Sequence, residues 1–502
     1  MSDLLQTLGL ATIAFLMVVN GFYILLLGCA ALEMRRHILQ VREETHWRVL
    51  RSRVAPTVSM LVPAFNESET IVGSVRALLT LHYANLEVVV VNDGSSDDTL
   101  GVLEREFGLV AVHPIYWRRL AHQEVRGIYR SGSNRGLVVV DKKAGGKADA
   151  LNCGLNIASG ELACAIDADT LIEPDGLLRM ARPFLHGEGV VAAGGTIRVA
   201  NGSAVRSGRV QTPRTPRKLL PGIQSVEYLR AFLFGRLGWN RLGGNLIISG
   251  AFGLFRREMV IAAGGYLSNT VGEDMELVVR MRRQGVENGT AHRVEFIPDP
   301  VAWTEVPESL RGLGRQRDRW QRGLADVLWR SRDVAMRPRY GTLGLVALPY
   351  FIIVELLAPV VEAIGLLTVA LDLAIGPLDF SLALLFLLVA YGFGVLLSIL
   401  TLMLDEFSNP RHTGGADRLL MVLWACLESF GYRQLCTYWR LRGLVKFVRG
   451  DISWGVSTRI GFSDSPLSRK APREGFEMSL APELGEVRSR VEGLIAPWRR
   501  NL

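Results

Sequence analysis

Acidic side chains follow two short apolar runs of this sequence. Asp93 ends the run LEVVVVND, and Asp167 and Asp169 follow the run LACAI. Side chains two residues apart on a strand lie on one face, so the last two carboxylates would point the same way. Carboxylate oxygens suit hard cations such as Mg²⁺ or Mn²⁺, and a nucleotide diphosphate needs such a cation or basic side chains to balance its charge. The three aspartates are therefore candidates for a site that binds a metal and a diphosphate.

The same aspartates also have ordinary structural explanations. The segment NDGSSDD can be a strand-to-helix turn in which Asp97 caps the helix. Asp93 comes earlier, at the end of the strand, and is better placed for a ligand. A D-x-D pair is a common pattern, and its position after an apolar strand is what distinguishes Asp167 and Asp169.

A second pair of carboxylates, Glu273 and Asp274 in GEDMEL, opens a predicted helix that continues to Arg283. A carboxylate can remove a proton from an attacking hydroxyl group. Acidic residues at a helix N-terminus also stabilise the helix dipole, which explains Glu276 better than Asp274. The segment is therefore a candidate for acid–base chemistry.

The elements that would position these residues alternate between β-branched runs and amphipathic segments from Thr57 to Thr170. Continuous apolar strands separated by helices indicate an α/β fold, with a parallel sheet covered on both faces. In such sheets ligands bind beyond the carboxyl ends of the strands. The polar residues expected at those ends are Asn66, Glu67, Asp93, Lys142, Lys143, Asp167 and Asp169.

The chain is more apolar than a soluble protein with this many charges. It has 502 residues, of which 49% are hydrophobic, and a mean hydropathy of +0.22. The segment from Leu8 to Leu32 carries no charge and is long enough to cross a bilayer. No basic region precedes it, as one would in a signal peptide, and six arginines follow it between Arg35 and Arg53. The positive-inside rule therefore places the residues after this span in the cytoplasm.

Further apolar blocks run from Leu343 to Ile375, from Leu382 to Leu404 and, more weakly, from Leu419 to Cys436. Three single spans would leave the basic tail outside the cell, against the positive-inside rule. Either the last block lies along the membrane interface, or the first block, broken by Pro359, is a re-entrant or double segment. The predicted parts are an N-terminal span (8–32), a cytosolic domain (51–306), amphipathic interfacial helices (307–340), C-terminal membrane or interfacial helices (341–440) and a cytosolic tail (441–502).

The net charge of +8 and the pI of about 9.4 need no nucleic-acid partner, because no nucleic-acid motif accompanies them and membrane anchoring explains them. The five cysteines show no metal-ligand spacing and are expected to be reduced.

Seven motifs occur in one order: VPAFNES, VVNDGSSDDT, KKAGGKADALN, AIDADT, SGAFGLFRR, GEDMELVVR and QRDRW. In this the chain resembles the inverting, membrane-embedded family-2 glycosyltransferases, which include cellulose, hyaluronan, chitin and poly-β-1,6-N-acetylglucosamine synthases. The resemblance covers about Thr57 to Arg322. It implies a GT-A-type nucleotide-diphospho-sugar transferase domain with a Rossmann-like, mostly parallel sheet, inserted between N- and C-terminal transmembrane helices.

The resemblance also implies roles for residues that match the motifs. Asp274 would be the catalytic base, and Asp169 would coordinate the metal, Mg²⁺ or Mn²⁺. The residues that would bind the donor are Glu67, Asp93, Lys147, Asp167 and Arg319. Lys142 and Lys143 are either ligand contacts or part of a solvated basic loop.

The acceptor would contact two further motifs. Gly250 and Phe252 in SGAFGLFRR would pass near the acceptor sugar, although the same segment can be an ordinary buried strand. Gln316 and Trp320 belong to the Q-x-x-R-W pattern of processive synthases, and Trp320 can stack on a sugar ring. The alternative for this helix is an interfacial aromatic with arginines that bind lipid headgroups.

Two acidic residues fall within the first C-terminal apolar block. Glu355 and Glu362 are seven residues apart and so share a helix face. Ionisable residues within a membrane segment face a cavity or a partner, so they either line a polymer exit path or pair locally with Arg433.

The predicted function is a processive inverting β-glycosyltransferase of the plasma (inner) membrane. Its cytoplasmic domain would polymerise sugar from a UDP-sugar donor, with UDP-N-acetylglucosamine favoured over UDP-glucose, into an exopolysaccharide of biofilms that crosses the membrane. Its other partners would be the growing polysaccharide, membrane lipids and accessory export or regulatory subunits. The alternatives are a transferase that adds one sugar to a lipid and an inactive export scaffold, which would not need the carboxylates that this chain keeps.

Overall fold

The computed structural model describes residues 2–42, 52, 55–167, 170–206, 208–290, 292–375, 380–408 and 414–451. Asp169 and the predicted cytosolic tail beyond Asp451 lie outside the described residues.

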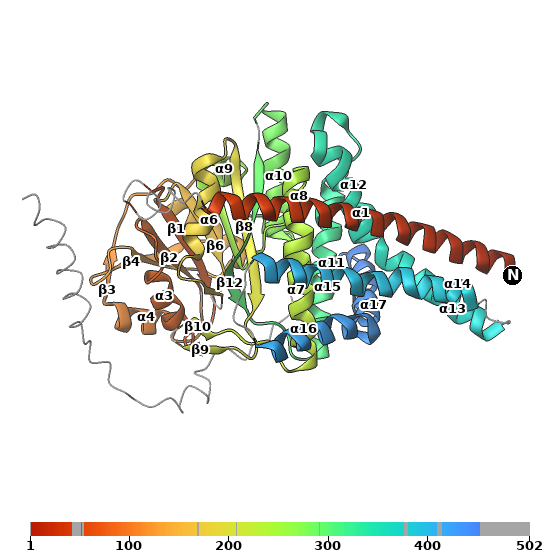
Figure 1. Cartoon of the computed structure of the whole chain (residues 1–502). Helices are drawn as coiled ribbons and strands as arrows, with labels where there is room; N and C mark the ends of the chain where they lie inside the picture. Colours follow the sequence, from red (N-terminus) through yellow and green to blue (C-terminus); the bar gives the residue numbers. More distant parts are fainter. Residues whose placement is uncertain are drawn as a thin grey trace, which may run out of the picture. The chain divides into compact units, whose positions relative to one another are not determined.

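The centre of the fold is a ten-stranded sheet in the order β3-β4-β5-β2-β1-β6-β11-β8-β12-β7 (Figure 1). Most strands run in one direction, because β1 is parallel to β2 and β6, β2 to β5, and β8 to β12. Strands β4, β7 and β11 run the other way. The strands are β1 (Val58–Ala64), β2 (Leu86–Asp93), β3 (Leu109–Val112), β4 (Val125–Ser131), β5 (Leu137–Lys142), β6 (Leu162–Ile166), β7 (Leu171–Ile172), β8 (Val190–Val199), β11 (Phe252–Arg256) and β12 (Arg293–Thr304). A separate hairpin pairs β9 (Ala204–Arg206) with β10 (Arg209–Thr212).

Both faces of the sheet are covered, as the apolar strands predict. In β2, Val88 and Val90 pack in one core cluster, and Val89 and Val91 pack in another. Successive side chains of a strand point to opposite faces, so each cluster marks one face. The α/β, mostly parallel sheet expected from the sequence is confirmed. The helices of this part are α3 (Ile71–Leu79), α4 (Thr99–Phe107), α5 (Lys147–Ile157), α6 (Gly176–His186), α9 (Arg257–Ala262) and α10 (Glu273–Glu287).

Three helices among the described residues are long and apolar enough to cross a membrane: Leu5–Gln40, Leu343–Asp372 and Phe380–Phe407. The first lies in α1 (Ser2–Arg42). The second joins η3 (Leu343–Ala347), α12 (Leu348–Tyr350), η4 (Phe351–Leu356) and α13 (Ala358–Ile375), and the third joins α14 (Phe380–Leu387), η5 (Leu388–Gly392) and α15 (Phe393–Ser408). These helices mark the chain as a membrane protein.

The last apolar block forms α16 (Gly415–Leu427), η6 (Glu428–Tyr432) and α17 (Arg433–Val448), which is not among the three candidate spans of the described residues. The helix bends at Phe430 and Gly431, where Gly431 has a φ of 78°. An interfacial position for this block stays a prediction.

Helix α11 (Leu310–Arg330) carries the QRDRW segment and packs against α17. Asp318 is 2% exposed between the two helices, and its Oδ2 lies 2.9 Å from Lys446 Nζ. Arg442 and Arg322 approach the same carboxylate at 3.6 and 3.7 Å. A buried carboxylate needs such partners, so this charge cluster fixes α11 on α17.

A pair of glycines joins α11 to α10. A Cβ on Gly272, just before α10, would lie 3.1 Å from Gly323 Cα of α11, and a Cβ on Gly323 would lie as close to Gly272 Cα. The two backbones therefore approach as closely as glycine allows. This contact sets the start of α10 against the helix that carries QRDRW.

Candidate active site

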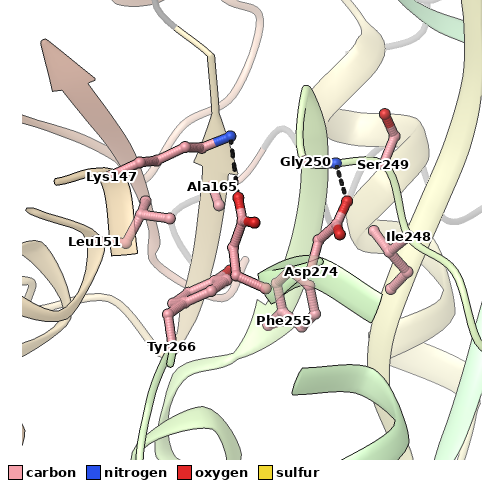
Figure 2. A pocket seen from close by; sticks show the side chains of 10 residues that line it. Lys147, Leu151, Ala165, Ile248, Ser249, Gly250, Phe255, Tyr266 and Asp274 are labelled. Carbon is pink, nitrogen blue, oxygen red and sulfur yellow. Dashed lines mark hydrogen bonds and ion pairs between the residues drawn. The ribbon is translucent and has the colours of Figure 1, made fainter. Parts of the chain in front are cut away.

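A pocket lies near the carboxyl ends of the parallel strands, where the sequence predicts a ligand site. Residues from helices α5 and α10, from strands β6 and β11 and from the loops beside β11 form it. The pocket is lined by Lys147, Leu151, Ala165, Ile248, Ser249, Gly250, Phe255, Tyr266, Glu273 and Asp274. Lys147 is the first residue of α5, and Glu273 and Asp274 are the first two residues of α10. Figure 2 shows the Asp274 carboxylate pointing to the Gly250 N–H, with Lys147 extending from the opposite side.

Lys147 is the cation of this pocket. Its Nζ lies 2.6 Å from Asp167 Oδ1 and 3.8 Å from Glu273 Oε1. Burial alone would lower the pKa of Lys147, but the carboxylates of Asp167 and Glu273 outweigh it and hold the pKa above its usual range. Lys147 therefore stays protonated and can move between these carboxylates and a bound anion.

Glu273 belongs to the carboxylate pair that the sequence predicts for acid–base chemistry, although the resemblance implies a specific role only for Asp274. It is buried, and burial raises its pKa to about 7, with Lys147 lowering and Asp274 raising it. Near neutral pH this carboxyl is therefore partly protonated. The signal available in the sequence was its place beside Asp274 at a helix start.

Asp274, the predicted base, is held by backbone donors. The N–H of Gly250 donates to Asp274 Oδ2 at 3.0 Å, and the N–H of Met275 donates to Oδ1 at 2.8 Å. A Cβ on Gly250 would lie 3.3 Å from both Asp274 Oδ2 and Lys147 Nζ. Glycine at this position therefore lets the loop before β11 reach both charged groups.

Asp93 lies at the end of β2, as predicted, and its carboxylate is buried. It accepts hydrogen bonds from the Lys142 ammonium and from the N–H groups of Gly145 (2.9 Å) and Gly146 (2.7 Å). Asp93 thus shapes the loop that leads into Lys147 and α5. Its contact with a nucleoside stays a prediction.

The two neighbouring lysines differ. Lys142 is fully buried and lies 2.6 Å from Asp149 as well as next to Asp93, so the solvated-loop alternative is wrong for it. That alternative describes Lys143, whose exposed Nζ lies 2.6 Å from Glu124 Oε2.

The first loop of the sheet is organised by local hydrogen bonds. Glu67, a predicted donor contact, accepts from Thr70 Oγ1 at 2.5 Å, and its N–H donates to Thr99 Oγ1 at 2.9 Å. The carboxylate of Asp97 accepts from the N–H of Thr99, the first residue of α4, at 3.1 Å. The N-cap residue of α4 is Asp98, whose side chain makes no capping hydrogen bond, so Asp97 contacts the first residue of the helix without being its N-cap.

Of the two predicted D-x-D carboxylates, the described residues include Asp167, whereas Asp169 lies outside them. Asp167 offers a partly exposed carboxylate beside Lys147. No group of three or more His, Cys, Asp or Glu side chains that could hold a metal occurs within the described ranges. The donors present fit Mg²⁺ or Mn²⁺ that is bound by one or two carboxylates together with substrate phosphates.

The predicted acceptor residues divide into buried and accessible ones. Phe252 is fully buried in β11, so the buried-strand alternative describes its side chain, and Phe255 of the same strand lines the pocket instead.

On α11, Trp320 is 44% exposed and lies under the guanidinium of Arg317, which is 4.5 Å from the ring centroid. Gln316 is half-buried, and its Oε1 is buried without a hydrogen bond. Arg319, predicted to bind pyrophosphate, is also half-buried on this helix.

Sequence reasoning missed the anchor of Trp320. Arg317 Nη2 donates to Glu227 Oε2 at 2.6 Å and to the Tyr432 hydroxyl at 3.1 Å, and the same hydroxyl donates to Glu227 at 2.6 Å. These contacts join α11 to α7 (Leu219–Leu229) and η6, far apart in sequence. They hold the guanidinium that packs on Trp320.

Of the two membrane carboxylates, Glu362 pairs with Arg433 at 3.1 Å and accepts from Thr437 at 3.2 Å. The local-pairing alternative is thus confirmed for Glu362. Glu355 lies 3.2 Å from the Tyr350 hydroxyl and 3.8 Å from Arg440. An exit path along these residues stays a prediction.

Comparison with known proteins finds two family models on this part of the chain. The model "Glycosyl transferase family 2" matches residues 59–262, and "Glycosyl transferase family group 2" matches residues 164–397. The first contains Asp93, Lys147 and Gly250, and the second contains Asp274 and α11. These matches agree with the GT-A-type transferase domain expected from the motifs.

Curated relatives carry a common name. The chain is 28% identical over 283 residues to poly-beta-1,6-N-acetyl-D-glucosamine synthase of Staphylococcus aureus (strain COL), covering 56% of this chain and 58% of the relative. It is 28% identical over 275 residues to the synthase of the same name from Staphylococcus epidermidis, covering 55% and 56%. The matched region thus spans little more than half the length of these relatives.

Two solved structures are similar at lower identity. The mannosyltransferase of Pyrobaculum calidifontis, in complex with GDP-Man and Mn²⁺, is 20% identical with a TM-score of 0.47, covering 84% of this chain and 99% of that one. Glucosyl-3-phosphoglycerate synthase of Mycobacterium tuberculosis is 17% identical with a TM-score of 0.33, covering 57% and 84%.

Proposed function

We propose that this chain, a glycosyltransferase with a family-2 domain, is a processive inverting β-glycosyltransferase that extends a polysaccharide with N-acetylglucosamine from UDP-N-acetylglucosamine. The observation that carries the proposal is the Asp274 carboxylate, held by the Gly250 N–H on the opposite side of one pocket from Lys147. The name of the curated relatives supports N-acetylglucosamine over glucose as the transferred sugar.

The donor side of the pocket neutralises the diphosphate. Lys147, now 2.6 Å from Asp167, exchanges this carboxylate for phosphate oxygens, which satisfy an ammonium equally well. Asp167 and Asp169 would hold Mg²⁺ or Mn²⁺, which supplies Lewis-acid stabilisation of the leaving diphosphate. Arg319 adds a second fixed cation, and Asp93 with Glu67 orients the nucleoside end.

The acceptor side removes a proton. The terminal hydroxyl of the acceptor donates to the Asp274 carboxylate and attacks the anomeric carbon as the bond to the diphosphate oxygen breaks. Asp274 takes the proton, UDP leaves, and the new bond has inverted configuration. The two backbone N–H groups keep the carboxylate aimed at the hydroxyl throughout.

The contacts that join α11 to the C-terminal helices support processivity. Trp320 and Gln316 lie on α11, which packs on α17 and touches the π-helical segment η4 of the second candidate span. A sugar stacked on Trp320 is therefore handed directly to a protein surface that continues into the membrane. We place the catalytic domain in the cytoplasm, where UDP-sugars are made, as a multi-pass plasma-membrane enzyme that works with accessory export or regulatory subunits.

The test is to incubate the purified full chain in detergent with Mg²⁺ or Mn²⁺ and either UDP-N-acetylglucosamine or UDP-glucose, and to size the product. A long polymer from the first donor, absent with Asp274→Asn, is the expected result. A product that stops after one sugar on a lipid would overturn processivity, and a polymer from UDP-glucose alone would overturn the donor. Absence of any UDP release under all conditions would overturn the enzyme assignment.

A further inference from the structure

Two tryptophans of α11 each lie under an arginine, but the two arginines are held differently. Arg317 lies over the Trp320 ring and Arg332 over the Trp329 ring, and in both pairs the guanidinium carbon is 4.5 Å from the ring centroid. Arg332 is exposed, and it donates to the backbone carbonyl of Trp329 at 2.9 Å. Arg317 is only 5% exposed and is bonded to segments far away in the sequence. Of the two rings, Trp320 is therefore the one whose arginine is fixed by the tertiary structure.

Arg317, Glu227 and Tyr432 form a closed triad of hydrogen bonds. Arg317 Nη2 donates to Glu227 Oε2 at 2.6 Å and to the Tyr432 hydroxyl at 3.1 Å, and this hydroxyl donates to Glu227 Oε2 at 2.6 Å. Tyr432 is buried, like Arg317. Each member takes part in two of the three hydrogen bonds, so none can turn without breaking both of its own. The triad therefore fixes the position of the guanidinium that covers Trp320.

A second ion pair joins the segments that supply the triad. Glu227 lies in α7, and three residues later Arg230 begins the π-helical segment η1 (Arg230–Arg236). Arg230 Nη1 donates to Glu428 Oε2 at 2.8 Å, and Glu428 begins η6, the segment that ends at Tyr432. Two polar contacts thus connect the α7–η1 segment to η6, although Glu227 and Tyr432 are 205 residues apart in the sequence. The triad rests on a frame that does not depend on α11 alone.

A buried arginine contributes orientation to this contact. An apolar side chain could cover the indole without the desolvation cost that a buried charge carries, and the ion pair with Glu227 offsets this cost only in part. The guanidinium, however, is planar and packs flat on an aromatic face, while its N–H groups fix the direction of its plane. The triad therefore determines the orientation of the Trp320 ring.

The rest of the ring remains accessible. Trp320 is 44% exposed although the guanidinium covers one face of the indole. A sugar gains from stacking on such a ring only when the two faces lie parallel and close together. A ring that already has the right orientation loses less conformational entropy when the sugar binds, so the contact is tighter.

Resting on the proposed function, in which Trp320 stacks on the acceptor, we propose that Glu227, Arg317 and Tyr432 are positioning residues that hold the Trp320 ring in its sugar-binding orientation. They act through the ring and not by contact with the sugar. Because a pre-oriented ring releases the polymer more slowly, the triad increases the number of sugars that are added before the product leaves.

The experiment is a double-mutant cycle between the triad and the ring. The purified full chain in detergent is given saturating UDP-N-acetylglucosamine and a short β-1,6-linked N-acetylglucosamine oligosaccharide, and kcat, acceptor KM and product length are measured. Arg317→Lys keeps a charge beside Glu227 but loses the planar group over the ring, so the acceptor KM should rise about 2- to 10-fold and the product should shorten. The KM for the donor should not change. In Trp320→Ala protein the same substitution should have no further effect, because the ring that it positions is gone.

Tyr432→Phe is a gentler variant that removes two hydrogen bonds of the triad and keeps the aromatic ring. It should raise the acceptor KM less than Arg317→Lys does, and again only when Trp320 is present. The matched control is Arg332→Lys, which changes the arginine over Trp329 and should leave the acceptor KM and the product length unchanged.

A purely structural role would give a different result. If Arg317→Lys and Tyr432→Phe lowered kcat and Tm by the same amount with and without the Trp320 ring, the triad would serve the fold of α11 and the inference would be overturned. A Trp320→Ala chain with an unchanged acceptor KM would also overturn it, because there would be no sugar-binding ring to position.

The proposed function fails separately. A wild-type chain that releases no UDP from any UDP-sugar would overturn both proposals, whereas wild-type and Arg317→Lys chains that make polymer of the same length with the same acceptor KM would overturn this one alone.

Discussion

The proposed donor and acceptor sides satisfy their polar groups in different ways. On the donor side, Lys147 is paired with Asp167, and Lys142 is paired with Asp93 and Asp149. On α11, which carries the proposed acceptor residues Gln316 and Trp320, Gln316 Oε1 is buried without a hydrogen bond. A donor diphosphate would therefore compete with carboxylates that already hold a cation, whereas an acceptor hydroxyl would meet an oxygen atom that has no other hydrogen-bond donor.

The largest effect should come from Asp274, which borders both sides. Asp274→Asn removes the proton acceptor but keeps the shape and the contact with Gly250, so kcat should fall about 100- to 10,000-fold. The affinity for UDP should stay within a factor of about three, since the donor side is intact. UDP release and UDP binding measure the two quantities.

The control for Asp274 lies two residues further along α10. Glu276 is paired with Arg280 at 2.8 Å, and Glu276→Gln should leave kcat within a few-fold of wild type. If both variants lost kcat equally, the start of the helix and not the base would be responsible.

Lys147→Gln tests whether the Lys147 ammonium exchanges the Asp167 carboxylate for phosphate oxygens of the donor. It should raise the KM for the UDP-sugar and lower kcat/KM about 10- to 100-fold, because a charged contact with phosphate is lost. The Kd for an oligosaccharide acceptor should not change. Steady-state kinetics with each substrate varied in turn test this, and an acceptor effect as large as the donor effect would erase the distinction between the two sides.

Trp320→Ala should have a smaller effect, confined to the acceptor side. Loss of a stacking face is worth about 0.5–1.5 kcal/mol, so the acceptor KM should rise about 2- to 10-fold and the average product should shorten. Trp329 is a matched control, since it is 60% exposed on the same helix and also has an arginine over its ring. An equal effect of Trp329→Ala would indicate a general interfacial role for α11.

The smallest effect concerns stability and pH. The pKa of Glu273 is raised to about 7 in the folded chain, above its ordinary value in the unfolded chain. The folded state therefore binds this proton more tightly, and the stability it contributes is present at acidic pH and is lost as the pH rises through about 7. Melting curves between pH 5 and pH 8 should show a Tm that falls less steeply with pH in Glu273→Gln than in wild type.

The local sequence pattern predicted the site residues that lie at strand ends and at the start of a helix. Alternating apolar strands and helices fix a sheet, and a sheet fixes where its strands end, so Asp93 and Asp167 could be placed from sequence. The start of α10 at Glu273 was likewise visible, because acidic residues favour a helix N-terminus. The antiparallel direction of β11 was not predicted. Phe252 and Phe255 lie on opposite faces of this strand, and only Phe255 lines the pocket.

The remaining features depend on contacts between distant segments. Lys142 looks like a loop lysine until β2 and α5 supply Asp93 and Asp149 around it. Arg230 and Arg236 look alike in the sequence, and only the fold pairs Arg230 with Glu428 and places Arg236 over the Phe232 ring. Burial and pairing of a charge are tertiary properties, so no periodicity or spacing reveals them.

The charge cluster around Asp318 sets an order of biogenesis. Asp318 belongs to the helix that carries QRDRW, yet the lysine that neutralises it, Lys446, is 128 residues further along the chain. While the ribosome is still synthesising the C-terminal helices, the lysine and arginine of α17 that neutralise this carboxylate do not yet exist, so α11 lacks the partners that hold it. Any activity that depends on the position of α11 should therefore appear only after α17 has been made and has packed against it.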